Sequence, residues 1–208
     1  MRLTGKRLQG KWQRGLSIVG LNIMGNSAAR KSDIVNIAIL AVLASCIGAY
    51  LVATAVLIAE DGVRYVEEAR SFSVDPAQGV KGEAFGYPFL IFAAHKIVVL
   101  FGAGSSIQVW IYSAQGVALL CRVLTLIPLY FIGRILVGGR QSFWAVLILV
   151  MLPYPAHFGS DALRDWPHIL FLAAGLLFLF QGAERAKWWM FGIAGLMSGL
   201  GYRLYNRN

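Results

Sequence analysis

Asp61 and Arg64 stand three residues apart, directly after a long apolar run. If this segment is helical, the two side chains lie one turn apart on the same face. A carboxylate at the mouth of a membrane helix can accept a proton. A guanidinium beside it can hold a phosphate through two hydrogen bonds. A second interpretation, that both are solvated side chains ending a span, stays open on chemistry alone.

The element that must position Asp61 is the run from Ile34 to Ala59, which only small and hydroxyl residues interrupt. About 20 apolar residues suffice for a helix to cross a bilayer. Over the whole chain of 208 residues, 58% are apolar and 14% are charged. A soluble domain carries about 25% charged residues. The composition therefore predicts an integral membrane protein.

The first 32 residues contain basic residues and no carboxylate: Arg2, Lys6, Arg7, Lys11, Arg14, Arg30 and Lys31. The positive-inside rule keeps such a segment in the cytoplasm. We therefore expect residues 1–32 to be a basic cytoplasmic tail, the chain to lie in the plasma (inner) membrane, and the Asp61 loop to be extracytoplasmic. No nucleic-acid partner is expected, because no recognisable module or arginine-rich repeat accompanies the charge.

Four further apolar runs are long enough to be spans, and they lie at about 107–133, 141–158, 166–181 and 188–201. The run Tyr87–Leu100 is shorter and suits a re-entrant or interfacial helix. Before it, Val63, Val66 and Ala69 recur three apart, as in an amphipathic helix on the interface. The predicted fold class is all-α, a polytopic transmembrane helix bundle of about five spans plus a re-entrant or interfacial helix.

Alternation of these spans predicts which loops share a side of the membrane. With the tail inside, the turns at 134–140 and 185–187 are also inside, where their basic residues belong. The Asp61 loop and the loop holding Asp161, Arg164 and Asp165 then meet on the opposite side. Helix capping explains Asp161 and Asp165 as well as a site does.

Asp61, Arg64, Tyr65 and Ala69 together resemble the first-loop motif of GT-C membrane glycosyltransferases. These are the family-39-like enzymes, which include protein O-mannosyltransferases and aminoarabinose lipid A transferases. Three later segments, 86–90, 129–139 and 153–165, are similar to signatures of the same family in the same order. Gly62 differs from the second acidic residue that many members have there.

The resemblance implies transfer of a sugar from a polyprenyl-phosphate donor to an acceptor on the extracytoplasmic side. Asp61 is then the catalytic base, and Arg64 and Tyr65 bind the donor phosphate. The same resemblance implies possible site-lining residues, namely Glu60, Tyr87, Asp161, Arg164 and Asp165. No cofactor is expected, since no glycine-rich phosphate loop follows a strand and no residue set predicts a metal. A divalent metal and the oligomeric state stay open.

The resemblance also predicts that residues 33–202 form a GT-C-like transmembrane domain and that residues 203–208 are a possible truncation tail. On this expectation the chain is the N-terminal part of a longer enzyme. The alternatives are a non-enzymatic membrane subunit, a transporter fragment or an inactive truncated product. Intramembrane charges beyond Arg122 would favour transport, and none is clearly placed, so the transporter ranks lower. A lone buried guanidinium is costly, so we expect Arg122 to be structurally paired.

Overall fold

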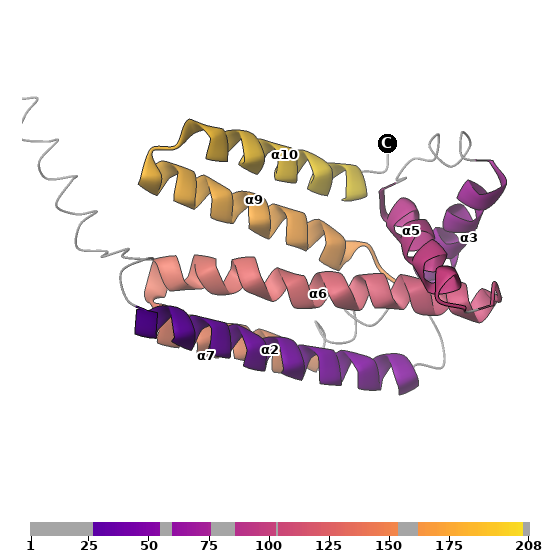
Figure 1. The fold of residues 1–208 in the computed structure, drawn as a ribbon, viewed down its shortest axis with the longest axis horizontal. Helices are drawn as coiled ribbons and strands as arrows, with labels where there is room; N and C mark the ends of the chain where they lie inside the picture. The colour runs from indigo at the N-terminus through magenta and orange to yellow at the C-terminus, as the bar shows by residue number, and fades with distance from the viewer. Residues whose placement is uncertain (1–26, 55–59, 76–85, 103, 154–161, 206–208) are drawn as a thin grey trace, which may run out of the picture. The chain divides into compact units, whose positions relative to one another are not determined.

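The computed structural model describes residues 27–54, 60–75, 86–102, 104–153 and 162–205. All regular structure within these ranges is helical, which confirms the predicted all-α membrane bundle (Figure 1). The helices are α2 (Ser27–Thr54), α3 (Glu60–Val74), α5 (Gly86–Leu100), α6 (Ile107–Val137), α7 (Gly139–Met151), α9 (Asp165–Arg185) and α10 (Trp188–Tyr205).

The chain divides into two compact units, Met1–Val35 and Asn36–Asn208. Of the first unit, only the beginning of α2 is described. The second unit contains the rest of α2 and all the other helices, so the candidate site and its supports belong to it alone.

Within the described part of the chain, three helices are long and apolar enough to cross a membrane: Arg30–Thr54, Ile107–Val137 and Asp165–Arg185. They correspond to three of the predicted spans. The predicted span at 141–158 overlaps α7, which begins at Gly139, has 13 residues and is thus about 20 Å long at 1.5 Å per residue. The helix ends because Leu152 is extended (φ −66°, ψ 131°), the conformation that a following proline favours. Residues 154–158 lie outside the described part of the chain.

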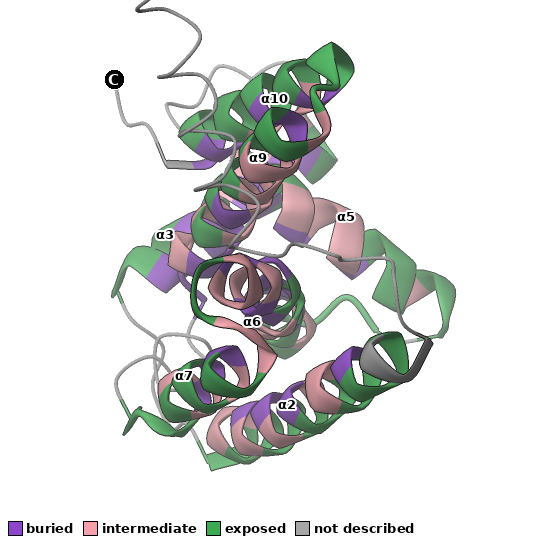
Figure 2. Ribbon diagram, turned by 90° about the vertical axis from the view of Figure 1, so that its left-hand side faces the viewer, coloured by how far each residue is buried: buried purple, intermediate pink, exposed green. Residues whose placement is uncertain are grey.

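Helix α6 is the centre of the second unit, and α7, α9 and α5 all pack against it (Figure 2). One buried cluster joins α2, α6 and α7 and consists of Leu40, Ala44, Leu126, Tyr130, Val146 and Val150. The α6–α7 hairpin is closed by Ser142, whose hydroxyl donates to the carbonyl of Tyr130 at 2.6 Å. A Cβ on Gly133 would lie 2.6 Å from that hydroxyl oxygen, so this crossing needs a glycine.

The α9–α10 pair is an antiparallel hairpin whose two helices lie side by side (Figure 1). Ala186 ends α9 in the left-handed conformation (φ 50°). At the opposite end of the pair, His168 Nδ1 donates to the carbonyl of Gly201 at 2.8 Å, which requires the proton on Nδ1 because a carbonyl only accepts. Residues 203–205, predicted to begin a separate tail, complete α10, and Leu204 is buried.

Helices α3 and α5 pack on each other and on α6. The predicted amphipathic helix exists as α3, but its buried face is Gly62, Tyr65, Val66, Ala69 and Phe72. Val63 is 43% exposed, so the prediction that it shares the apolar face is wrong. A spacing of three drifts off a helical stripe, whereas the observed face follows the 3.6-residue period.

Candidate functional site

Helix α3 carries Glu60 and Asp61 as its first two residues, and both carboxylates are exposed. Free backbone N–H groups give the beginning of a helix a positive potential. The two acidic residues therefore stabilise the end of α3 at which they stand. Asp61 is accessible to a substrate, as a general base must be.

Gly62 brings α3 against the segment that precedes α9. A Cβ built on Gly62 would lie 3.0 Å from the Cβ of Ala162 and 3.2 Å from its carbonyl oxygen. Ala162 is fully buried and belongs to the same apolar cluster as Tyr65. The close approach explains why position 62 is a glycine.

Gly62→Val is expected to destabilise the protein by about 1–3 kcal/mol, because the added methyl groups overpack the α3–Ala162 crossing. The free energy of unfolding in detergent measures this effect. Gly116→Val is the control, because a Cβ on Gly116 meets nothing within 4 Å. Equal stability of the two variants would show that the crossing is not tight.

Tyr65, Tyr87 and Arg164 form a contact group drawn from three segments of the chain. The rings of Tyr65 and Tyr87 meet edge to face, with centroids 5.3 Å apart. The guanidinium carbon of Arg164 lies 5.8 Å from the centroid of the Tyr65 ring. The Tyr87 hydroxyl donates to the carbonyl of Ala114 in α6 at 3.2 Å. The structure thus brings together one predicted phosphate-binding residue and two predicted site-lining residues.

Arg64 lies on the exposed side of α3 and pairs with Glu68, with Nε and Oε1 3.1 Å apart. Exposed pairs of this spacing contribute only about 0.3–0.5 kcal/mol. The guanidinium can therefore exchange Glu68 for a better acceptor at little cost.

The remaining predicted site-lining residues belong to the loop before α9 and to the beginning of that helix. Asp165 is the first residue of α9, half-buried and at the favourable end of its dipole. Asp161 lies outside the described residues. Of the predicted residues in this loop, Arg164 is therefore the one whose contact with α3 the described residues show; Ala162, which was not predicted, also lies against α3.

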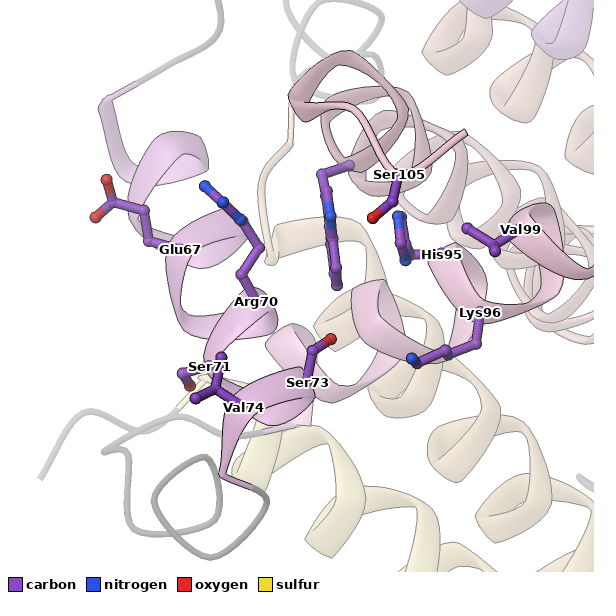
Figure 3. Close-up of a pocket in the computed structure, with 10 residues that line it drawn as sticks. Glu67, Arg70, Ser71, Ser73, Val74, His95, Lys96, Val99 and Ser105 are labelled. Atoms are coloured by element: carbon purple, nitrogen blue, oxygen red, sulfur yellow. The ribbon is translucent and has the colours of Figure 1, made fainter. Parts of the chain in front are cut away.

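A cavity of about 500 Å³ opens at the other end of α3 (Figure 3). Its polar lining includes Glu67 and Arg70 from α3, His95 and Lys96 from α5, and Ser105. This cavity was not predicted from the sequence. The available signal was the pair His95–Lys96 inside an otherwise apolar run. Among the described residues, no group of three or more metal-ligating side chains is present.

The fold and these contacts define a class: an all-α membrane protein with a polar site where α3, α5 and the beginning of α9 meet. The family model for dolichyl-phosphate-mannose-protein mannosyltransferases matches residues 83–206, more than half of the chain. The chain belongs to this family, whose members are membrane glycosyltransferases of the mannosyltransferase type. The match includes Tyr87 and Arg164 but begins after Asp61 and Arg64. No curated protein and no solved structure matches the chain.

Proposed function

We propose that this protein transfers a sugar, mannose by its family, from a polyprenyl-phosphate donor to an acceptor on the extracytoplasmic side of the membrane. One observation carries the proposal. Gly62 packs on Ala162, and Arg164 packs on Tyr65. These contacts hold Asp61 and Arg64 beside the loop before α9, where donor and acceptor can be bound together.

Asp61 is the general base in this proposal. It takes the proton of the acceptor group as the acceptor oxygen forms a bond to the anomeric carbon of the sugar. The bond from that carbon to the phosphate oxygen breaks, and the electron pair leaves with the lipid phosphate. No other co-reactant is required, so the protein's contribution is positioning, proton transfer and charge stabilisation.

Arg64 binds the phosphate whose negative charge increases as the bond breaks. A bidentate guanidinium–phosphate contact is stronger than the exposed pair with Glu68 that it replaces. Tyr65 is 2% exposed, and its contribution is to anchor α3 against Tyr87 and Arg164. Arg164 adds a second positive charge beside the same helix.

The proposal is tested with the purified full chain in liposomes. Labelled mannose supplied as polyprenyl-phosphate mannose, together with membrane extract as the source of acceptor, should give labelled product, whereas GDP-mannose should give none. Product from GDP-mannose alone would contradict the lipid donor. If no product forms from the lipid donor, the activity of this chain is refuted.

The side of the membrane is tested separately. The experiment uses intact cells that produce a variant of the protein without its native cysteines. In this variant, Asp61→Cys should react with a maleimide that does not cross membranes. Both native cysteines, Cys46 and Cys121, must be replaced first. Labelling only after the cells are lysed would place Asp61 in the cytoplasm and end the proposal.

A further inference from the structure

The cavity at the far end of α3 is separate from the proposed catalytic site. Asp61 and Arg70 are nine residues apart on one helix, which corresponds to about 13 Å along the axis. One wall of the cavity is α3 and the other is α5 with the beginning of α6. The base and the donor-binding residue proposed above, Asp61 and Arg64, do not line it, and neither does Tyr65.

His95 is the buried polar group of this cavity. Its side chain is 3% exposed, and neither ring nitrogen has a hydrogen-bond partner among the described residues. The ring is stacked on Trp110 at 3.6 Å between centroids, with 8° between the planes. Burial, and then the charge of Lys96, lower the pKa of His95. A lowered pKa favours the neutral ring, which has one N–H donor and one acceptor nitrogen. A buried polar group without a partner costs free energy, and a ligand would relieve that cost.

Arg70 lines the cavity from α3 and Lys96 lines it from α5 (Figure 3). Both side chains are exposed, and neither forms an ion pair with a carboxylate in the described part of the chain. Lys96 lies over the ring of Phe92, 5.3 Å from the centroid, which holds the ammonium close to α5. Arg70, Lys96 and His95 all line this one cavity, and guanidinium, ammonium and imidazole N–H groups are donors that suit a phosphate group.

Exposed apolar side chains stand at and near the ends of the two helices that line this polar space. Val74, which lines it, is 88% exposed, and Leu100 and Phe101, close to the lining residue Val99, are 83% and 86% exposed. A polar cavity bordered by exposed apolar side chains is typical of the boundary between headgroups and acyl chains. The volume of about 500 Å³ exceeds that of a phosphate ion and leaves room for the rest of a headgroup. The carboxylate of Glu67 can accept a hydrogen bond from a hydroxyl group of that headgroup.

We propose that this cavity is a second binding site, for the phosphate-bearing headgroup of a membrane lipid, held by Arg70, Lys96 and His95. The phosphate lies between the two cations and accepts the N–H of His95. The acyl chains follow Val74, Leu100 and Phe101. The site is independent of the role of Asp61, so it stands whether or not that residue is the catalytic base.

The test uses the purified full chain in detergent, labelled with ¹⁵N at histidine. The chain has three histidines, and His95→Gln identifies the signal of His95. Short-chain dihexanoyl phosphatidylglycerol should shift this signal in a saturable manner. Dihexanoyl phosphatidylcholine, whose choline carries no hydroxyl and adds a positive charge, should bind more weakly. Inorganic phosphate alone distinguishes a headgroup site from a simple anion site: an equal response to it would overturn the lipid assignment.

Two double variants are compared, and each removes two positive charges from the protein. Arg70→Gln combined with Lys96→Gln should weaken phosphatidylglycerol binding at least about tenfold, since two charge-assisted hydrogen bonds are lost. Arg140→Gln combined with Lys187→Gln removes two exposed cations outside the cavity and should leave the response of His95 unchanged. No saturable shift in the wild type, or equal weakening in both double variants, would refute the site.

Discussion

Asp61→Asn is expected to lower the rate of sugar transfer by a factor of about 10²–10⁴, the range that a positioned general base contributes. The amide has nearly the same shape as the carboxylate but cannot take a proton at neutral pH. Asp61 is exposed at the beginning of α3, so the substitution leaves the packing of Gly62 and Tyr65 in place. The loss therefore falls on kcat, with little change in KM for the lipid donor.

Glu60→Gln is the matched control for this experiment. Glu60 is the neighbouring acidic residue, equally exposed and in the same first turn of α3, so the control removes the same charge from the same helix end. Less than about tenfold loss is expected, because this end of the helix keeps one carboxylate and the base is intact. Equal losses in both variants would indicate a general electrostatic effect and would remove Asp61 from its role.

Local sequence patterns were sufficient to predict the elements on which the site depends. The apolar runs predicted α2, α6 and α9 as spans, and the polar segment after Glu60 predicted α3. Alternation of spans predicted that the Asp61 loop would meet the loop before α9. The contacts of Gly62 with Ala162 and of Tyr65 with Arg164 join these two segments. The roles of the predicted site residues stay predictions.

Other features depend on contacts between residues far apart in the chain. The stacking of His95 on Trp110 joins two helices, and no spacing within either helix specifies it. The cavity beside them is lined by residues of α3, of α5 and of the beginning of α6, so it depends on how these helices pack on one another. Arg122 was recognised as a buried cation that needs a partner, but its partner could not be named from the sequence.

That partner is the end of α7, and it leads to the largest stability effect that we expect. Arg122 is fully buried in α6, and its Nη2 donates to the carbonyl of Val150 at 3.1 Å. Carbonyls in the last turn of a helix have no partner within the helix, and a cation is favourable at this end. The guanidinium also lies 5.9 Å from the ring centroid of Trp166 in α9. Arg122 thus links α6 to α7 and α9 within the apolar bundle.

Arg122→Ala is expected to lower the free energy of unfolding by about 3–5 kcal/mol, because it leaves both a cavity and an unpaired carbonyl. Arg122→Met fills most of the volume, and the expected loss is about 1–3 kcal/mol, the cost of the unpaired carbonyl alone. Arg140→Ala changes an exposed arginine near the beginning of α7 and should stay within about 0.5 kcal/mol of wild type. Titration with SDS, followed by tryptophan fluorescence, measures all three. A methionine variant more stable than wild type would show that the cost of burying the guanidinium exceeds the value of its contacts, and that Arg122 is kept for another reason.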